Sequence, residues 1–395
     1  MGPVNLPSAW GRLGEIPWAA LNPALRGELA PVLASVLSGT PAERALDRFL
    51  RRHRDLDSPS RRAVAEAIFG VSLWRRRLAA LLAFPRWEDA PPSALLDALV
   101  QRPDLPLPDR LAARASLPDW LERLLLDESA DLGDPAAFAE AINLPGPVCL
   151  RVQRATRAEL LPTLPEARAC ALSPLGVILD GRPNVLGLPA YQRGLLEPQD
   201  EGSQLLGLLL DARPGETLLD FCAGAGGKTL LLAGVTSDRA TIHAHDPDPE
   251  RLARLRQRAA RAGFTSIRAG SLPASPCDRV LVDAPCSELG ALRRGPDLRW
   301  RIDPASFARL PALQGEILAA AARHVRPGGR LVYATCTIRR AENESVCFGF
   351  ERAHPGFRRE APLFPSLSTP DGFFRVLPHL HGTDGFFAAT WTRRP

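Results

Sequence analysis

The sequence contains only one lysine, Lys228, although lysine and arginine together account for 49 of its 395 residues. This skew, together with 39 prolines, indicates compositional drift toward arginine, alanine and proline. A lysine that survives such drift is expected where arginine cannot replace it. No apolar run reaches the roughly 18 residues that a membrane-spanning helix needs. Residues 1–18 lack the basic and apolar regions of a secretory signal, so we expect a soluble cytoplasmic protein with no membrane partner.

The sequence also lacks any C-x-x-C pair, although it holds seven cysteines. An odd number without such spacing argues against a disulfide framework and against a zinc site, and we expect no metal. Most of these thiols should be reduced and should pack as small buried hydrophobes. The cysteines are Cys149, Cys170, Cys222, Cys277, Cys286, Cys336 and Cys347.

The net charge of +5 and the pI near 9.0 permit a polyanionic partner without requiring one. Residues 43–77 hold ten arginines against five acidic residues, an excess that equals the net charge of the whole chain. A basic helical face can follow phosphate groups. A solvated surface is the more frequent explanation for an isolated charge cluster, so the cluster alone does not identify a nucleic-acid site.

The first part of the chain is expected to be helical, because apolar residues recur at helical spacing through residues 17–84. Residues 85–108 are rich in proline and should include a loop, and helical patterning returns at 109–142. Pro145-Gly146-Pro147 then interrupts the chain. We therefore predict an all-α domain over residues 1–143.

The second part of the chain carries strand signals. Short apolar runs predict a small α/β subdomain over residues 144–202, with strands at 148–152, 169–172 and 176–179. From residue 203 to 395 strands alternate with helices, which predicts a doubly wound α/β sheet with its ligand crevice at the carboxyl ends of the strands. The expected strands are 217–221, 241–245, 279–282 and 330–334, and the expected helices are about 227–235, 248–262 and 305–325.

A glycine-rich turn follows the first strand of this sheet and leads into a helix. Glycines let the backbone approach a ligand, and the helix N-terminus offers free N–H groups. The spacing is not that of a P-loop. Asp246 ends the next strand, where a carboxylate can accept both ribose hydroxyls of a nucleoside cofactor; an ordinary strand–helix turn with a surface aspartate is the simpler alternative. The turn comprises Cys222, Ala223, Gly224, Ala225, Gly226, Gly227 and Lys228.

Two cysteines terminate two further strands at the same predicted edge. Val280–Val282 runs into Asp283-Ala284-Pro285-Cys286, and Leu331–Ala334 runs into Thr335-Cys336. Either cysteine alone is more simply a packing thiol. Because both end strands beside a nucleoside-binding turn, we interpret them as functional.

Paired thiols suit methylation at carbon 5 of cytosine, which is a poor nucleophile. A thiolate that adds to carbon 6 makes carbon 5 nucleophilic toward a sulfonium methyl group. A base must then remove the carbon 5 proton, and Asp283 could hydrogen-bond or protonate N3. The attacking thiol needs a depressed pKa, which a nearby sulfonium and strand-end amides could supply. Spacing and chemistry leave the roles of the two thiols interchangeable.

These motifs resemble those of RNA 5-methylcytosine methyltransferases. The helical N-terminal stretch Arg62–Leu73 is similar to a NusB-like domain, and the combination resembles the bacterial Sun/RsmB type, which methylates small-subunit (16S) ribosomal RNA. The resemblance is strongest from about residue 199 to the end. The motifs that carry it are Asp220-Phe221-Cys222-Ala-Gly-Ala-Gly-Gly-Lys-Thr, Asp283-Ala-Pro-Cys286-Ser, Tyr333-Ala-Thr-Cys336-Thr and Glu342-Asn343-Glu344.

The resemblance implies a class I (Rossmann-like) methyltransferase domain that uses S-adenosyl-L-methionine. It implies that Cys336 is the nucleophile, that Cys286 assists release, and that Asp283 is the active-site acid. It also places the cofactor at residues 222–228, Asp246 and Asp283. Ser271 stands where the family usually has an acid that contacts adenine, and Gln153 stands where an asparagine is common.

The expected partner is RNA, most simply 16S rRNA, and we expect a monomer. Candidates for phosphate contacts near the active site are Arg293, Arg294, Arg299 and Arg301. Two alternatives stay open. The substrate could be tRNA or another rRNA position, or the chain could be a catalytically inactive RNA-binding assembly factor, which only Ser271 favours.

Overall fold

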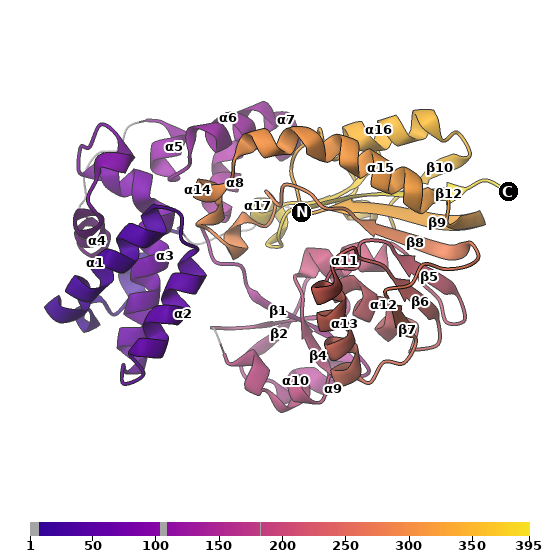
Figure 1. The fold of residues 1–395 in the computed structure, drawn as a ribbon, viewed down its shortest axis with the longest axis horizontal. Coiled ribbons are helices and arrows are strands. Elements are labelled where there is room, and N and C mark those ends of the chain that lie inside the picture. Colours follow the sequence, from indigo (N-terminus) through magenta and orange to yellow (C-terminus); the bar gives the residue numbers. More distant parts are fainter. Residues whose placement is uncertain (1–7, 103–108, 182) are drawn as a thin grey trace. The chain divides into compact units, whose positions relative to one another are not determined.

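The structure is a computed structural model that describes residues 8–102, 109–181 and 183–395 (Figure 1). The chain forms two compact units. Among the described residues, the helical unit comprises those from 8 to 145 together with Leu292–Pro304, and the sheet unit comprises those of Gly146–Ala291 and Ala305–Pro395. None of the described helices is both long and apolar enough to cross a membrane.

The helical unit is built around α3 (Ser58–Leu81), whose apolar side chains form the centre of its core. Asp57 caps this helix by accepting a hydrogen bond from the Ser60 N–H, as Asn22 caps α1 at Leu25. The prediction of an all-helical first region is confirmed. Its other helices are α1 (Pro23–Leu37), α2 (Ala42–Arg52), α4 (Pro92–Gln101), α5 (Leu111–Arg114), α6 (Asp119–Asp127), α7 (Ser129–Leu132) and α8 (Pro135–Ala141).

One feature of the helical unit adds to the prediction, and a second differs from it. The proline-rich stretch contains α4, because Pro92 occupies the first helical turn, where its missing N–H costs no bond. Residues 103–108 of that stretch lie outside the described residues. The helical unit also recruits Leu292–Pro304, with α14 (Leu298–Arg301), from a region predicted to belong to the methyltransferase domain.

A small antiparallel sheet opens the sheet unit, with the strand order β2-β3-β1-β4. Its first and third strands match the prediction, but β2 lies at Ala167–Ala169 rather than at 169–172, since residues 171–175 turn back toward β3. The strands are β1 (Val148–Val152), β2, β3 (Gly176–Leu179) and β4 (Leu196–Pro198), with α9 (Arg157–Leu160) and α10 (Pro189–Gln192) between them.

The large sheet has the order β10-β12-β9-β8-β5-β6-β7, with β11 paired to β12. The strands from β9 to β7 are parallel, and β12 and β10 are antiparallel additions at one side. The predicted α/β class I methyltransferase architecture is confirmed. The strands are β5 (Thr217–Asp220), β6 (Thr241–Ala244), β7 (Ile267–Ala269), β8 (Cys277–Asp283), β9 (Val325–Thr335), β10 (Phe357–Glu360), β11 (Phe374–Val376) and β12 (Phe386–Arg393).

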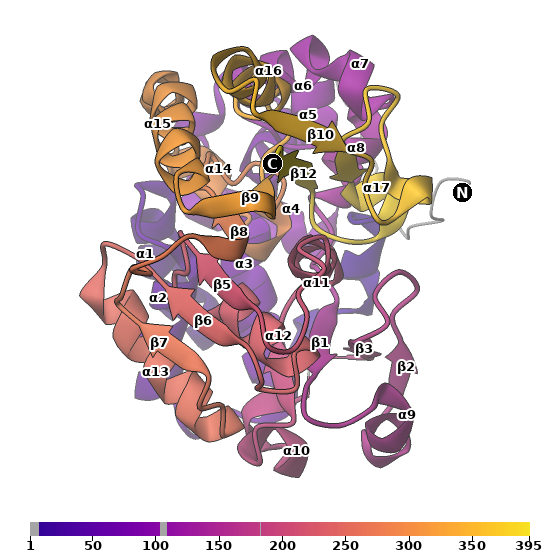
Figure 2. The same cartoon turned by 90° about the vertical axis from the view of Figure 1, so that its right-hand side faces the viewer.

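Helices cover both faces of this sheet (Figures 1 and 2). Alternate residues of each strand face opposite sides, so Leu218 packs with α11 and α12 while Leu219 packs on the side of α15 and α16. The chain runs from β5 outward to β7, then returns to β8 and builds in the other direction. The helices are α11 (Glu201–Leu208), α12 (Gly227–Val235), α13 (Pro249–Ala262), α15 (Leu310–Ala322), α16 (Glu344–Ala353) and α17 (Pro378–His381).

This reversal makes β5 and β8 neighbours at a topological switch point. In open α/β sheets ligands bind outside the carboxyl ends of the strands at such a point. The predicted motifs after β5, β6, β8 and β9 all lie at that edge.

Candidate active site

The loop between β5 and α12 has a backbone that its glycines permit. Gly224 and Gly226 have φ angles of +54° and +88°, in the left-handed region that side chains with a Cβ rarely adopt. A Cβ on Gly226 would also lie 2.6 Å from Leu255 of α13, whereas a Cβ on Gly224 would meet no atom within 4 Å. The Gly224 backbone therefore faces open space at the carboxyl edge of the sheet.

Asp246 fastens this loop to the end of β6. Its Oδ2 accepts a hydrogen bond from the Gly224 N–H at 2.9 Å, and its Oδ1 accepts one from the Asp248 N–H at 2.9 Å. The residue is buried. A glycine backbone open on one side, an adjacent carboxylate and the N-terminus of α12 fit the amino-acid and ribose groups of a nucleoside sulfonium cofactor.

Lys228, the single lysine, makes an ion pair with Asp283 at 2.6 Å. Burial lowers the pKa of the Lys228 ammonium, but the Asp283 carboxylate outweighs that effect and leaves the pKa raised. The lysine side chain is buried, whereas Asp283 remains about one-third exposed. The pair therefore joins the cofactor loop to the end of β8 and leaves carboxyl surface available to a ligand.

The structure brings Cys286 and Cys336 together with an Sγ–Sγ distance of 3.4 Å. The two strands that carry them pair in parallel, with Asp283 opposite Ala334, so both thiols follow the same edge. Both cysteines are half-buried. The Cys286 side chain, burial and the Asp283 carboxylate all raise the pKa of the Cys336 thiol well above its ordinary value. These groups therefore favour the neutral thiol, whereas the Lys228 ammonium interacts electrostatically with Cys336 in the opposite sense.

Glu342 fastens the two cysteine loops to each other, a role that the sequence did not reveal. Its carboxylate is fully buried and accepts bonds from the Ser287 N–H at 3.0 Å and the Ser287 Oγ at 2.6 Å. The same carboxylate accepts bonds from Gln314 and Arg339, each at 2.9 Å. The only signal was the acidic Glu342-Asn343-Glu344 sequence shortly after Cys336.

Gly290 allows these loops to approach each other through the backbone. Its N–H donates to the Cys336 carbonyl at 2.9 Å, and its carbonyl accepts from the Gly385 N–H at 2.8 Å. A Cβ on Gly290 would lie 2.1 Å from the Gly385 oxygen, which no side chain could tolerate. Residues 286–290 are thus held against the backbone that carries the second thiol.

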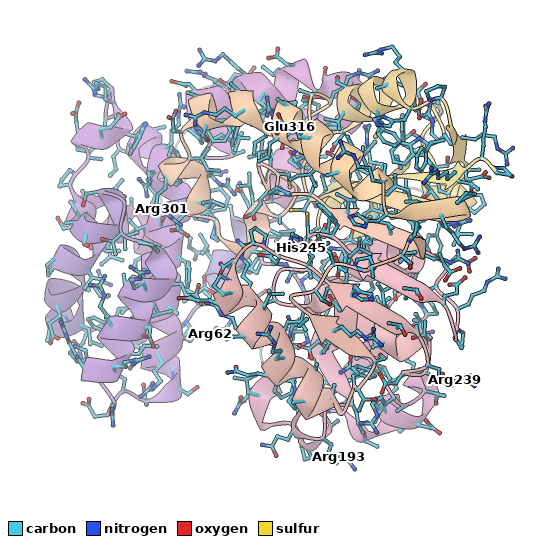
Figure 3. All side chains as sticks on the ribbon, turned by 45° about the vertical axis from the view of Figure 1, so that its right-hand side comes forward. Arg62, Arg193, Arg239, His245, Arg301 and Glu316 are labelled. Carbon is cyan, nitrogen blue, oxygen red and sulfur yellow. The ribbon has the colours of Figure 1, made fainter. Side chains whose placement is uncertain are left out.

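Ser271, which stands where the family usually has an adenine-contacting acid, lies just after β7. Its Oγ lies 3.1 Å from His243 Nδ1 and donates to the Arg268 carbonyl at 3.2 Å. Burial and Arg268 lower the pKa of His243, so the neutral ring is the form that pairs with the hydroxyl. Both polar contacts of Ser271 are thus made to residues of β6 and β7. In the same unit His245 lies among the strands, and Arg193 and Arg239 project from its outside (Figure 3).

The four arginines predicted to contact phosphate differ in accessibility. Arg299 is fully buried, donating to Asn143 Oδ1 at 2.7 Å and to the Ile142 carbonyl at 3.1 Å, and Arg293 is also buried. This burial speaks against a phosphate contact for Arg299, whose guanidinium is held by residues of the helical unit. Arg294 and Arg301 are exposed, and Arg301 pairs with Asp297 at 3.1 Å (Figure 3).

Comparison with known proteins gives a consistent assignment. The family described as "16S rRNA methyltransferase RsmB/F" matches residues 207–392. The "Probable ribosomal RNA small subunit methyltransferase B" of Synechocystis is 36% identical over 71% of this chain and 67% of its own length. The Bacillus subtilis protein of the same description is 35% identical over 72% and 68%.

Among solved structures, a methyltransferase homologue from Pyrococcus horikoshii has the same fold. It matches with a TM-score of 0.62 and 24% identity over 72% of this chain and 97% of that protein. The fold likeness thus extends beyond the large sheet.

Proposed function

The chain belongs to the RsmB/F family of 16S rRNA methyltransferases, and from this premise we propose that it methylates carbon 5 of a cytosine in small-subunit rRNA. The methyl donor is S-adenosylmethionine, which supplies an electrophilic methyl group when bound. The observation that carries the cytosine C5 assignment is the pair of thiols 3.4 Å apart, beside the Lys228–Asp283 ion pair. Carbon 5 chemistry needs a covalent nucleophile and a second group for release, and the pair provides both.

In the proposed reaction the Cys336 thiolate forms a bond to cytosine C6. The electrons of the C5–C6 double bond make C5 nucleophilic, and C5 takes the methyl group. A base then removes the hydrogen at C5, the electron pair restores the double bond, and the C6–S bond breaks to return the thiolate. We assign base-assisted release to Cys286, whose sulfur lies beside the nucleophile.

We assign Asp283 and Lys228 to activation of the cytosine ring toward attack at C6. The exposed part of the Asp283 carboxylate can accept a hydrogen bond from the exocyclic amine of cytosine, and one from N3 when that nitrogen is protonated. The buried Lys228 ammonium, 2.6 Å away, offsets negative charge that the thiolate places on the ring. A compact ammonium fits this enclosed position better than a planar guanidinium, which explains the single lysine of the chain.

The raised pKa of Cys336 means that the thiolate forms when positive charge approaches it. A sulfonium cofactor held by the 222–228 loop would supply such charge, in addition to the Lys228 ammonium.

RNA as a partner is supported by accessible arginines on the helical unit. Helix α2 exposes Arg44, Arg48 and Arg52, spaced four residues and thus about 6 Å apart along the axis. Such spacing suits successive phosphates of one strand. Of the four arginines predicted to contact phosphate, Arg294 and Arg301 are exposed and thus favoured, whereas Arg293 and Arg299 are buried.

The test is transfer of labelled methyl groups to 16S rRNA, followed by bisulfite mapping. Cys336→Ala should abolish transfer while S-adenosylmethionine still binds, and Cys286→Ala should accumulate a covalent protein–RNA adduct. Full activity of Cys336→Ala would disprove the nucleophile, and normal turnover of Cys286→Ala without any adduct would disprove the release role. Methylation found only in tRNA or at another ribosomal base would move the substrate but keep the chemistry.

A further inference from the structure

We propose that Arg151 and Arg258 are positioning residues for the S-adenosylmethionine loop, and that Glu197 ties them together. Arg151 belongs to the small sheet, and Arg258 to helix α13. Each donates a hydrogen bond to a backbone carbonyl of the 222–228 loop, so the geometry of this loop depends on groups outside the glycine-rich motif.

The two arginines hold two carbonyls of the loop. Arg258 Nη1 donates to the Ala225 carbonyl at 2.5 Å, and Arg151 Nη1 donates to the Gly227 carbonyl at 2.8 Å. With the bond from the Gly224 N–H to Asp246, three of four consecutive residues are fixed by side chains from three different elements. A carbonyl held on one side fixes its peptide plane and therefore the amide N–H on the opposite side. The Gly226 N–H donates to the Ala223 carbonyl at 2.9 Å, and the Lys228 N–H lies in the first turn of α12, where a ligand can meet it.

Arg151 is fully buried, which is costly for a guanidinium. Its Nη2 donates to Gln153 Oε1 at 2.6 Å, and its Nη1 also bonds Gln199. Burial lowers the pKa of Arg151 to about 9, so the side chain is still charged at neutral pH. These carbonyl partners fix the position of the buried Arg151 guanidinium, so its bond to the loop has a defined geometry. Gln153, the residue that replaces the asparagine common in the family, is one of these partners.

Glu197 connects the two arginines. It lies opposite Arg151 in the antiparallel pair of β1 and β4, and neighbouring strands place such residues on one face. Its buried carboxylate binds Arg258 Nε at 2.8 Å and also binds Arg261 one helical turn further along α13. The polar face of the small sheet is thus joined to the cofactor loop through Arg151 directly and through Glu197 and Arg258.

The arrangement of the small sheet fits this role. Leu150 and Val152 alternate with Arg151 along β1, and they pack in the apolar core on the other face. One face of the strand stabilises the small sheet, and the other face reaches the cofactor loop. An Arg151 that served only the small sheet would not need to bond a residue 76 positions away.

The experiment measures S-adenosylmethionine affinity by titration calorimetry in Arg258→Gln and Arg151→Gln of the full chain. Each variant loses a charge-assisted bond to the loop, so we expect the Kd to rise about tenfold or more. Amides of residues 222–228 should exchange with deuterium faster in both variants. Arg258→Lys keeps the charge and one donor, and its Kd should lie between those of the wild type and Arg258→Gln.

The matched control is Arg157→Gln. In the wild type, Arg157 donates to the Ser173 carbonyl at 2.9 Å, within the small subdomain. The variant should leave the Kd unchanged even where it lowers the melting temperature. The proposal would be overturned if Arg258→Gln folds and keeps the wild-type affinity and the wild-type amide exchange of the loop. If Arg151→Gln does not fold, Arg258→Gln alone decides the test. The inference rests on the proposed function only for the identity of the ligand. The titration does not measure methyl transfer to cytosine. Wild-type binding of S-adenosylmethionine without RNA methylation would therefore refute the proposed function alone.

Discussion

Asp220 carries a fully buried carboxyl group at the end of β5, directly before the cofactor loop. Thr229 Oγ1 donates to its Oδ2 at 2.7 Å, while Oδ1 has no partner among the described residues. Burial raises the pKa of Asp220 from 3.8 to about 7; the Thr229 bond opposes this rise, and Asp283 adds to it. Below about pH 7 the Asp220 carboxyl group of the folded chain is therefore mostly protonated.

This preference makes a prediction about stability and pH. Below pH 3.8 both states are protonated; between 3.8 and about 7 the unfolded chain releases the proton first, so the free energy of unfolding falls as pH rises. The difference corresponds to an upper limit of about 4 kcal/mol, fully lost above pH 7. Asp220→Asn should remove this loss and melt at a higher temperature than the wild type at pH 8, with a smaller gain at pH 5. Equal pH dependence of the two melting temperatures would show that Asp220 is not the responsible group.

At the scale of elements, strand ends explain why so much of the site was predictable. An apolar run of four to seven residues followed by a polar motif identifies both the strand and its carboxyl edge, and parallel strands bring such edges together. The loop after β5, Asp246, Asp283 and both thiols were found in this way.

The parts that could not be predicted depend on side-chain packing between distant segments. Glu342 bonds Ser287 across 55 residues, and nothing in either local sequence specifies that partner. Arg299 looked like a surface arginine among several and is instead buried against residues more than 150 positions away. Charge counted along a sequence does not distinguish a solvated arginine from an enclosed one.

Glu342 carries the prediction at this scale. Glu342→Gln replaces one acceptor oxygen by an amide NH2 group, which can only donate. This group would face hydrogen-bond donors of Ser287 and of either Gln314 or Arg339, so those bonds would be lost. The loop bearing Cys286 should shift, and a displacement of about 1 Å can lower kcat on the order of a hundredfold. The Kd for S-adenosylmethionine should stay within about twofold, because residues 222–228 do not touch Glu342.

The control for this variant is Glu344→Gln in the same motif. Glu344 is also buried, and its carboxylate pairs with Arg375 of β11. Its kcat should stay close to that of the wild type. If Glu342→Gln and Glu344→Gln lowered kcat equally, a general loss of stability would explain both.

At the scale of the whole molecule, the division into units does not follow the chain. The chain leaves the sheet unit after Ala291, contributes Leu292–Pro304 to the helical unit, and returns at Ala305. Within the helical unit Trp300 packs against Trp87 with ring centroids 5.0 Å apart and the rings tilted by 52°, and the Arg75 guanidinium lies 4.8 Å from the centre of the Trp300 ring. The segment after the Cys286 loop thus packs within a unit whose other residues lie before residue 146.

Arg299 gives the sharpest test of this division. Its guanidinium fills a buried position and binds Asn143 and the Ile142 carbonyl at the end of α8, and burial lowers the pKa of Arg299 to about 9. Arg299→Ala leaves a cavity and two unpaired acceptors, which should cost about 3 kcal/mol. Because the partners belong to the helical unit, deuterium exchange should rise in α3 and α8 and stay unchanged in β5 and β8. Arg294→Ala, in the same segment but exposed, is the control and should leave exchange in both units as in the wild type. Faster exchange in β5 and β8 of Arg299→Ala would mean that Leu292–Pro304 stabilises the sheet unit instead.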